Sequence, residues 1–197
     1  YLALTGRVLG GAEALTAGLA DAQMDSGRLL SLWESLGQTP YENGEAVERW
    51  CVGHTLKTLS KDTFPHADID RVFALDSVTA IVQALEAGQG DWFTETSALL
   101  RKRSPLMLHV VLEQVRRARS MGLADELRME RDLVRRCFHL RPGAASETVE
   151  GIRALAVDKD HAPRWNPQKI EDVSPDAVTA FFDSPWPPHA HPLRNLG

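Results

Sequence analysis

Two glutamates, Glu126 and Glu130, are spaced so that their side chains share one face of an expected helix. Paired carboxylates of this kind can act as a general acid and a general base. The cations Arg131, Arg135 and Arg136 follow directly, however, and carboxylates that neighbour arginines are usually solvated or ion-paired. We therefore favour a structural role for this pair over a catalytic one.

The other candidate motifs lack parts that their chemistry needs. Gly6, Gly10 and Gly11 could form a glycine-rich phosphate loop, but no Lys-Ser or Lys-Thr follows them, so a turn between two helices is the better interpretation. His189 and His191 stand two apart in a proline-rich tail, and the seven histidines show no metal-ligand spacing. No G-x-S-x-G motif is present. The residues by themselves identify no catalytic site and no metal site in this chain.

Composition is that of an ordinary soluble protein, with 43% hydrophobic and 25% charged residues in a chain of 197. The apolar runs are short and interrupted by charges, which predicts no membrane partner. The net charge of −5 argues against a general nucleic-acid surface. Cys51 and Cys137 lie far apart without C-x-x-C spacing, which favours two free thiols and a cytoplasmic location.

Helix signals dominate the chain, and strand signals are nearly absent. We expect four segments: 1–25, a helix-turn-helix and a short extended piece; 26–68, a helix and an irregular connection; 69–183, a helical region; and 184–197, an extended or mobile tail. In the first half of the chain, the expected helices are one that ends at Thr5-Gly6, one over Gly11–Gly18, one from a Ser26 cap to Gly37 and one around Ala46–Cys51. Two more run from an Asp76 cap to Gly88 and from an Asp91 cap to Arg103. The remaining helices begin at Ser104-Pro105, Ser146 and Ser174-Pro175, and another lies around Leu127–Phe138.

Apolar residues at helical spacing predict which faces are buried. The helix after Ser104 should bury Leu106, Val110, Val111 and Val115, and its successor should bury Leu127, Leu133, Val134, Cys137 and Phe138. The stripe Val149, Ile152, Leu155 and Ala156 should also be buried, so that Ile152→Asp should destabilise the chain severely. The aromatic residues expected in the core are Trp33, Trp92, Phe138, Phe181 and Phe182.

Two stretches resemble a known family. YLALTGRVLGGAEALTAGLAD, at the start, is similar to the segment that follows the active-site helix in the enoyl-CoA hydratase/isomerase (crotonase) superfamily. EGIRALAVDKDHAPRWNP, Glu150 to Pro167, resembles the C-terminal signature of its 3-hydroxyisobutyryl-CoA hydrolase branch. Ser104-Pro105 and Met129-Glu130 match the same branch, whereas Thr148 and Leu106-Met107 depart from its usual residues.

This resemblance implies a mainly α chain that is the C-terminal helical portion of a crotonase-like (ββα spiral) α/β fold, with the N-terminal sheet core missing. It implies that the oxyanion loop and catalytic acids lie upstream of Tyr1, so that no catalytic residue lies in this chain and the chain alone is inactive. The intact protein would hydrolyse 3-hydroxyisobutyryl-CoA or a similar short branched hydroxyacyl-CoA, as in valine catabolism, with no cofactor besides the CoA thioester. Its partners would be the acyl-CoA, the missing half and possible further copies of itself.

Asp158-Lys159-Asp160 has two interpretations. The resemblance to hydratases makes Lys159 a candidate contact for the CoA nucleotide, although it stands one residue later than in those enzymes. A cation near the carbonyl end of a helix, flanked by two acids, is the simpler interpretation and is slightly favoured. Two alternatives for the whole protein stay open, namely a hydratase or isomerase of the same superfamily and a non-catalytic helical interaction module.

Overall fold

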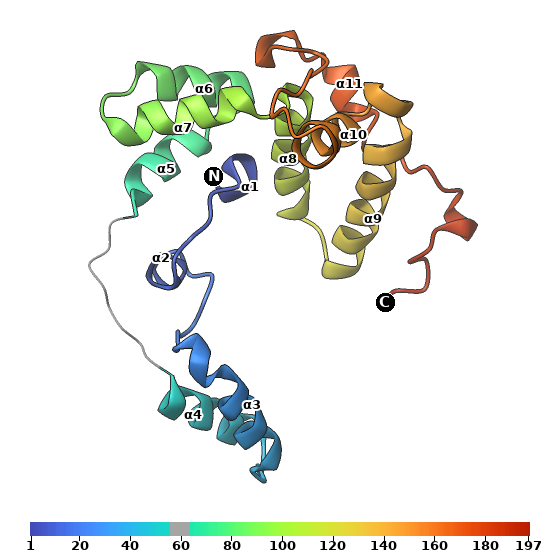
Figure 1. Ribbon diagram of the computed structural model, residues 1–197. Helices are drawn as coiled ribbons and strands as arrows, with labels where there is room; N and C mark the ends of the chain where they lie inside the picture. Colours follow the sequence, from blue (N-terminus) through green and yellow to red (C-terminus); the bar gives the residue numbers. More distant parts are fainter. Residues whose placement is uncertain (56–63) are drawn as a thin grey trace. The chain divides into compact units, whose positions relative to one another are not determined.

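The computed structural model describes residues 1–55 and 64–197, and no β-strand occurs among them. The chain divides into two compact units, Arg7–Asp68 and a larger unit formed by Tyr1–Gly6 with Ile69–Gly197. This division rests on compactness alone, and the four segments expected from the sequence stay a prediction. The helices (Figure 1) are α1 (Leu2–Thr5), α2 (Gly11–Thr16), α3 (Leu29–Gln38), α4 (Gly44–His54), α5 (His66–Phe73), α6 (Val78–Ala87), α7 (Asp91–Lys102), α8 (Pro105–Ala118), α9 (Leu123–His139), α10 (Glu147–Ile152) and α11 (Pro175–Thr179).

The smaller unit carries α2, α3 and α4. Asp25, not Ser26, accepts a capping hydrogen bond, from Gly27 N, at the start of a 3-10 turn (Ser26–Arg28) that leads into α3. Helix α3 continues through Gly37 and ends at Gln38. Trp33 is 71% exposed, so the prediction that it belongs to the core is wrong. Asn43 caps α4 by accepting from Ala46 N, which explains why this helix begins earlier than expected.

One core of the larger unit lies among α1, α5, α6, α7 and the turn at Ile170–Asp172. Helix α1 ends at Gly6, whose φ of 63° is a conformation that glycine adopts without strain. The predicted caps Asp76 and Asp91 are wrong by one residue each, because the N-cap positions are Ser77 and Gly90. The buried residues of this core are Leu4, Val72, Val78, Ile81, Val82, Leu85, Phe93, Leu100, Leu108 and Ile170, and Trp92 packs against it.

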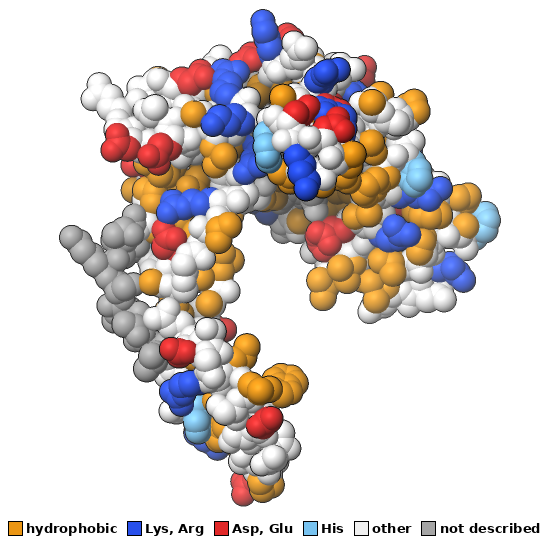
Figure 2. All heavy atoms as spheres, viewed as in Figure 1, with side chains coloured by type: hydrophobic (Ala, Val, Ile, Leu, Met, Phe, Trp, Pro, Cys, Tyr) orange, Lys and Arg blue, Asp and Glu red, His pale blue; other side chains and the backbone are white. Residues whose placement is uncertain are grey.

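A second core joins α8, α9 and α11. Ser104 accepts from Met107 N, and Pro105 occupies the first turn, as predicted. The buried residues here are Leu106, Val110, Met129, Leu133 and Phe181, with Phe182 and Cys137 packed against them. The burial predicted for Val115, Leu127, Val134 and Phe138 is wrong: these side chains are exposed, and the last three lie with Leu123 along one face of α9, where Figure 2 shows hydrophobic side chains at the surface.

The tail after Ser184 contacts α9 through His191, a residue that the sequence placed in an extended or mobile tail. His191 and Asp132 are both buried, and 3.2 Å separates His191 Nε2 from Asp132 Oδ1. Leu193 N donates to His191 Nδ1, so the imidazole proton lies on Nε2 and points at the carboxylate. Arg128 donates to the carbonyl oxygens of Leu193 and Leu196.

Candidate functional site

Helix α10 buries a polar face, which reverses the orientation predicted from its apolar stripe. Glu147 and Glu150 are only 6% and 4% exposed, whereas Ile152 and Leu155 are 46% and 66% exposed. Ser146 caps the helix as predicted, accepting from Val149 N and donating to the carbonyl oxygen of Cys137. The predicted burial of Ile152 and Leu155 is wrong, because the inward positions of this helix are taken by carboxylates that have specific partners.

Those partners are the backbone N–H groups of the chain as it returns along α10. Arg164 N donates to Glu150 Oε1 at 2.7 Å, and Asn166 N donates to Glu147 Oε1 at 2.8 Å. Residues three apart on a helix lie on one face, and residues two apart on an extended chain point the same way. The spacing Glu147-x-x-Glu150 therefore matches alternate N–H groups of the returning segment.

Arg153 connects Glu150 to the acidic pair of the signature. Its guanidinium donates to both oxygens of Glu150 and, at 2.7 Å, to Asp158 Oδ2 and to Asp160 Oδ2. The Arg153 hydrogen bonds, followed by the one from Arg164 N, lower the pKa of Glu150 to about 2. Hydrogen bonding from Arg153 is also the largest cause of the lowered pKa of Asp160.

The helix changes to a π-helical turn at Arg153–Val157 and then leaves the helical path. Lys159 and His161 have φ angles of 56° and 54°, a left-handed conformation that is uncommon for residues other than glycine. Asp158 and Asp160 thus hold Arg153, and Lys159 is exposed between them. The role of Lys159 in CoA binding stays a prediction, since its side chain lies outside the lining of the pocket described next.

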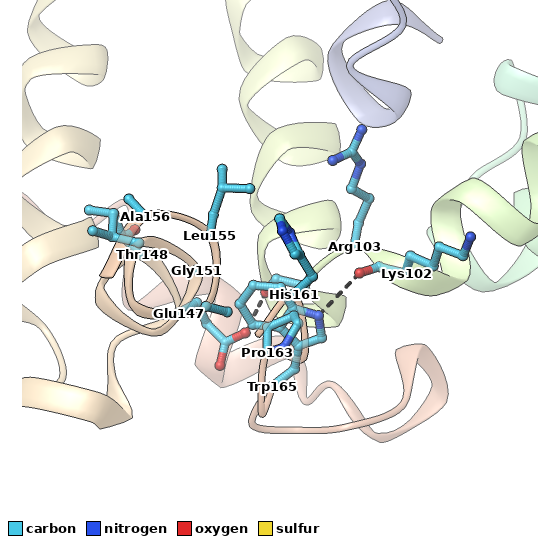
Figure 3. Close-up of a pocket in the computed structure, with 13 residues that line it drawn as sticks. Lys102, Arg103, Glu147, Thr148, Gly151, Leu155, Ala156, His161, Pro163 and Trp165 are labelled. Atoms are coloured by element: carbon cyan, nitrogen blue, oxygen red, sulfur yellow. Dashed lines mark hydrogen bonds between the residues drawn. The ribbon is translucent and has the colours of Figure 1, made fainter. Parts of the chain in front are cut away.

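A pocket of about 500 Å³ lies beside the exposed side of α10 (Figure 3). Trp165 forms one wall, and its Nε1 donates to the carbonyl oxygen of Lys102 at 3.2 Å. A Cβ atom at Gly151 would lie 3.3 Å from Trp165 Cη2, so glycine permits this close approach. The full lining is Lys102, Arg103, Ser104, Glu147, Thr148, Gly151, Ile152, Ala154, Leu155, Ala156, His161, Pro163 and Trp165.

The pocket combines an apolar wall with cations at one side. Lys102 and Arg103 follow one another at the end of α7, and Arg103 also donates to the carbonyl oxygen of Thr5 in α1. Ser104 Oγ lies 2.5 Å from Glu147 Oε2, so the carboxylate nearest the pocket is already hydrogen-bonded through both oxygens. The Lys102 side chain is directed away from Trp165 (Figure 3), so the apolar wall is the main feature that this pocket offers a ligand, and both oxygens of Glu147 are engaged in holding the fold.

The other residues singled out from the sequence lie elsewhere. Glu126 and Glu130 are on α9; the pKa of Glu126 is raised by burial and then by Glu130, and Gln114 donates to Glu130. No group of three His, Cys, Asp or Glu residues in the described part of the chain could hold a metal ion. Among residues 1–55 and 64–197, no helix has the length and apolar character that crossing a membrane requires.

The family model described as Enoyl-CoA hydratase/isomerase matches residues 1–182. The chain therefore belongs to the enoyl-CoA hydratase/isomerase family. An enoyl-CoA hydratase structure from Rhodobacter sphaeroides 2.4.1 superposes with a TM-score of 0.74 at 28% identity, over 95% of this chain and 51% of that one. This agrees with the expectation that the helices are the C-terminal portion of a crotonase-like fold.

Three curated relatives describe the branch. The 3-hydroxyisobutyryl-CoA hydrolase-like protein 5 of Arabidopsis thaliana is 32% identical over 92% of this chain and 48% of its own length. The mitochondrial 3-hydroxyisobutyryl-CoA hydrolase of Gallus gallus is 30% identical over 92% of this chain and 47% of its own. The small ribosomal subunit protein mS47 of Arabidopsis thaliana is 31% identical over 92% of this chain and 46% of its own. The chain spans about half the length of the curated relatives it matches.

Proposed function

We propose that this chain is the C-terminal part of an acyl-CoA thioester hydrolase that acts on 3-hydroxyisobutyryl-CoA or a similar short branched hydroxyacyl-CoA. The observation that carries the proposal is the match, over nine-tenths of the chain, to relatives that bear this hydrolase name. The reaction adds water to the thioester carbonyl, breaks the carbon–sulfur bond, and releases the hydroxy acid and the CoA thiol. A role in valine catabolism follows from that substrate and belongs to the same proposal.

The described residues support a binding role for this part of the protein. The apolar wall that contains Trp165 suits the hydrophobic portions of a CoA ester, and Lys102 and Arg103 at the end of α7 give the neighbouring surface positive charge. Donors from this chain meet both oxygens of Glu147 and of Glu150 and hold these carboxylates in the fold, so we place the catalytic acids and the oxyanion donors in the segment that completes the fold. Lys159 is proposed as a further contact for the CoA nucleotide.

A second candidate is a non-catalytic helical module. The similarity to protein mS47, whose name places it in a ribosomal subunit, favours this candidate because it extends over as much of the chain as the similarity to the hydrolases. Both candidates use the same helical scaffold, so the fold does not separate them. The chemistry does, since only the hydrolase releases CoA.

The test is the release of free CoA, followed with a thiol reagent. We expect no turnover of 3-hydroxyisobutyryl-CoA by residues 1–197 alone, and turnover when the complementary half of a family member is supplied in the same chain or by co-expression. Crotonyl-CoA serves as the comparison substrate, because hydration without CoA release would identify the hydratase alternative. Robust hydrolysis by residues 1–197 alone would refute the placement of the catalytic groups and direct attention back to Glu126 and Glu130.

The cytoplasmic location expected from the cysteines stays a prediction. The chicken relative carries "mitochondrial" in its name. Fractionation of cells that express the tagged protein would place it in one compartment or the other. Self-association also stays a prediction, for which sedimentation of the completed protein is the direct measurement.

A further inference from the structure

We propose that Glu147 and Glu150 are positioning residues that fix Trp165 in the wall of the α10 pocket and thereby set how tightly that pocket holds its ligand. The inference rests on the proposed function only in taking the ligand to be the CoA portion of an acyl-CoA. The evidence for positioning is independent of the ligand, because it consists of contacts within this chain.

Glu147 and Glu150 accept hydrogen bonds from backbone N–H groups of the returning segment, as a neighbouring strand does in a sheet. Arg164 N and Asn166 N point at the same helix face, where each is met by one carboxylate oxygen. Trp165 lies between them in sequence, and its ring lies against Gly151 of α10 in the wall of the pocket. The register of the two N–H bonds therefore decides where the indole is placed.

A third contact makes that placement depend on orientation as well as position. Trp165 Nε1 donates to the carbonyl oxygen of Lys102, and the indole ring lies so close to Gly151 that a Cβ atom there would be 3.3 Å from Trp165 Cη2. A slip of the segment by a fraction of an ångström would break the Nε1 bond or press the ring against α10. Small displacements of this kind are enough to change binding in a preformed site.

The carboxylates of Glu147 and Glu150 differ in the groups that meet their oxygens, and this difference predicts which of the two tolerates replacement by glutamine. Both oxygens of Glu150 meet donors only, from Arg153 and from Arg164 N. Glu147 meets a backbone N–H on one oxygen and the Ser104 hydroxyl on the other, and a hydroxyl can accept as well as donate. A glutamine amide therefore fits at position 147 by reversing the Ser104 bond, whereas at position 150 its NH₂ group faces another donor.

The experiment uses the completed protein and compares Glu150→Gln with Glu147→Gln. The matched control is Glu171→Gln, which removes an exposed ion pair of Arg101 at 2.7 Å in the same unit while leaving Glu86 as the partner of that arginine. The readouts are KM and kcat for thioester hydrolysis, the Kd of free CoA by calorimetry, and the ¹⁵N-indole resonance of Trp165, assigned by its loss in Trp165→Phe.

We expect Glu150→Gln to raise KM and the CoA Kd about tenfold, the factor that corresponds to the loss of one hydrogen bond. The value of kcat should be nearly unchanged, and the Trp165 resonance should move. Glu147→Gln, whose amide keeps one acceptor oxygen for Asn166 N, should change the same readouts less than Glu150→Gln does, and the control Glu171→Gln should match the wild type in all of them. If Glu150→Gln does not fold, Glu150→Asp, which keeps the carboxylate at shorter reach, should give an intermediate KM and a smaller shift of the resonance.

Two results would overturn the inference: an unmoved Trp165 resonance with wild-type KM in Glu150→Gln, or a Trp165 resonance that the control Glu171→Gln moves as far as Glu150→Gln does. A wild-type protein that neither hydrolyses acyl-CoA nor binds CoA would instead contradict the proposed function. In that case the indole resonance alone still decides whether the glutamates position the tryptophan.

Discussion

Two isoleucines in helices of the larger unit allow a direct measurement of which faces are buried. Ile81 on α6 has no exposed surface and packs in the first core, whereas Ile152 on α10 is 46% exposed beside the pocket. The same substitution, to alanine, removes the same atoms at both positions. A difference in the free energy of unfolding between the two variants therefore reports the difference in packing.

The expected magnitudes follow from burial. Ile81→Ala removes the buried side chain beyond Cβ and leaves a cavity, which costs about 3 to 4 kcal/mol. At Ile152 roughly half of the side chain is already in water, and the site opens onto the pocket. Alanine also has a higher helix propensity than isoleucine, which offsets a few tenths of a kcal/mol. The expected loss in the free energy of unfolding is therefore below about 1 kcal/mol. For a chain of this size, about 10 °C of Tm would be lost at Ile81 and about 3 °C or less at Ile152.

Far-ultraviolet circular dichroism during thermal and urea unfolding of residues 1–197 measures both values. Equal losses for the two variants would show that the Ile152 face is buried, as the apolar stripe in the sequence predicted, and that the orientation of α10 described above is wrong. Repeating the pair in a completed protein adds a second result, because a large cost at Ile152 only there would mean that the added segment covers this face.

Three further predictions concern the hydrogen bonds that hold the site and the tail. The lowered pKa of Glu150 means that its stabilisation is present above the ordinary glutamate pKa and is lost as the pH falls from about 4.5 to about 2; acid unfolding of Glu150→Gln, followed by circular dichroism, should be less steep in that range than that of the wild type. Ser104→Ala removes the cap of α8 and one partner of buried Glu147, and urea unfolding should show a loss of about 2 to 3 kcal/mol, whereas a loss under 0.5 kcal/mol would mean that water replaces the hydroxyl. His191→Ala should release the tail, so that trypsin cuts after Arg194 faster than it does in the wild type. An unchanged rate of cleavage would mean that the Arg128 hydrogen bonds alone hold the tail.

Local signals in the sequence were sufficient to predict where most helices lie. Ser104-Pro105, Ser146 and Ser174-Pro175 begin helices as expected, because a capping hydroxyl and a proline in the first turn act through neighbouring backbone atoms only. The caps at Asp76 and Asp91 were misplaced by one residue: the Ser77 hydroxyl accepts from Ala80 N, and Gly90 precedes its helix with a φ of 106° and no side-chain cap. The family, too, followed from short motifs read in their order along the chain.

Burial required the tertiary structure. The apolar stripe of α10 predicted an inward face, but two carboxylates occupy that face because the returning chain presents N–H groups to them across fourteen and nineteen residues. No helical periodicity encodes such a distant partner. The same holds for His191, whose buried contact with Asp132 spans fifty-nine residues and gave no sign in the spacing of the histidines.

What the sequence by itself determined is therefore where most of the helices lie, the caps Ser104, Ser146 and Ser174, and the enoyl-CoA hydratase/isomerase family, all of which depend on residues close together in the chain or on motifs in order. What only the tertiary structure decided is which faces are buried, and hence that Glu147, Glu150 and Arg153 hold the wall of a pocket containing Trp165. The physical reason is that a buried carboxylate is stable only where donors from another part of the chain meet it, and that meeting exists only in the folded molecule.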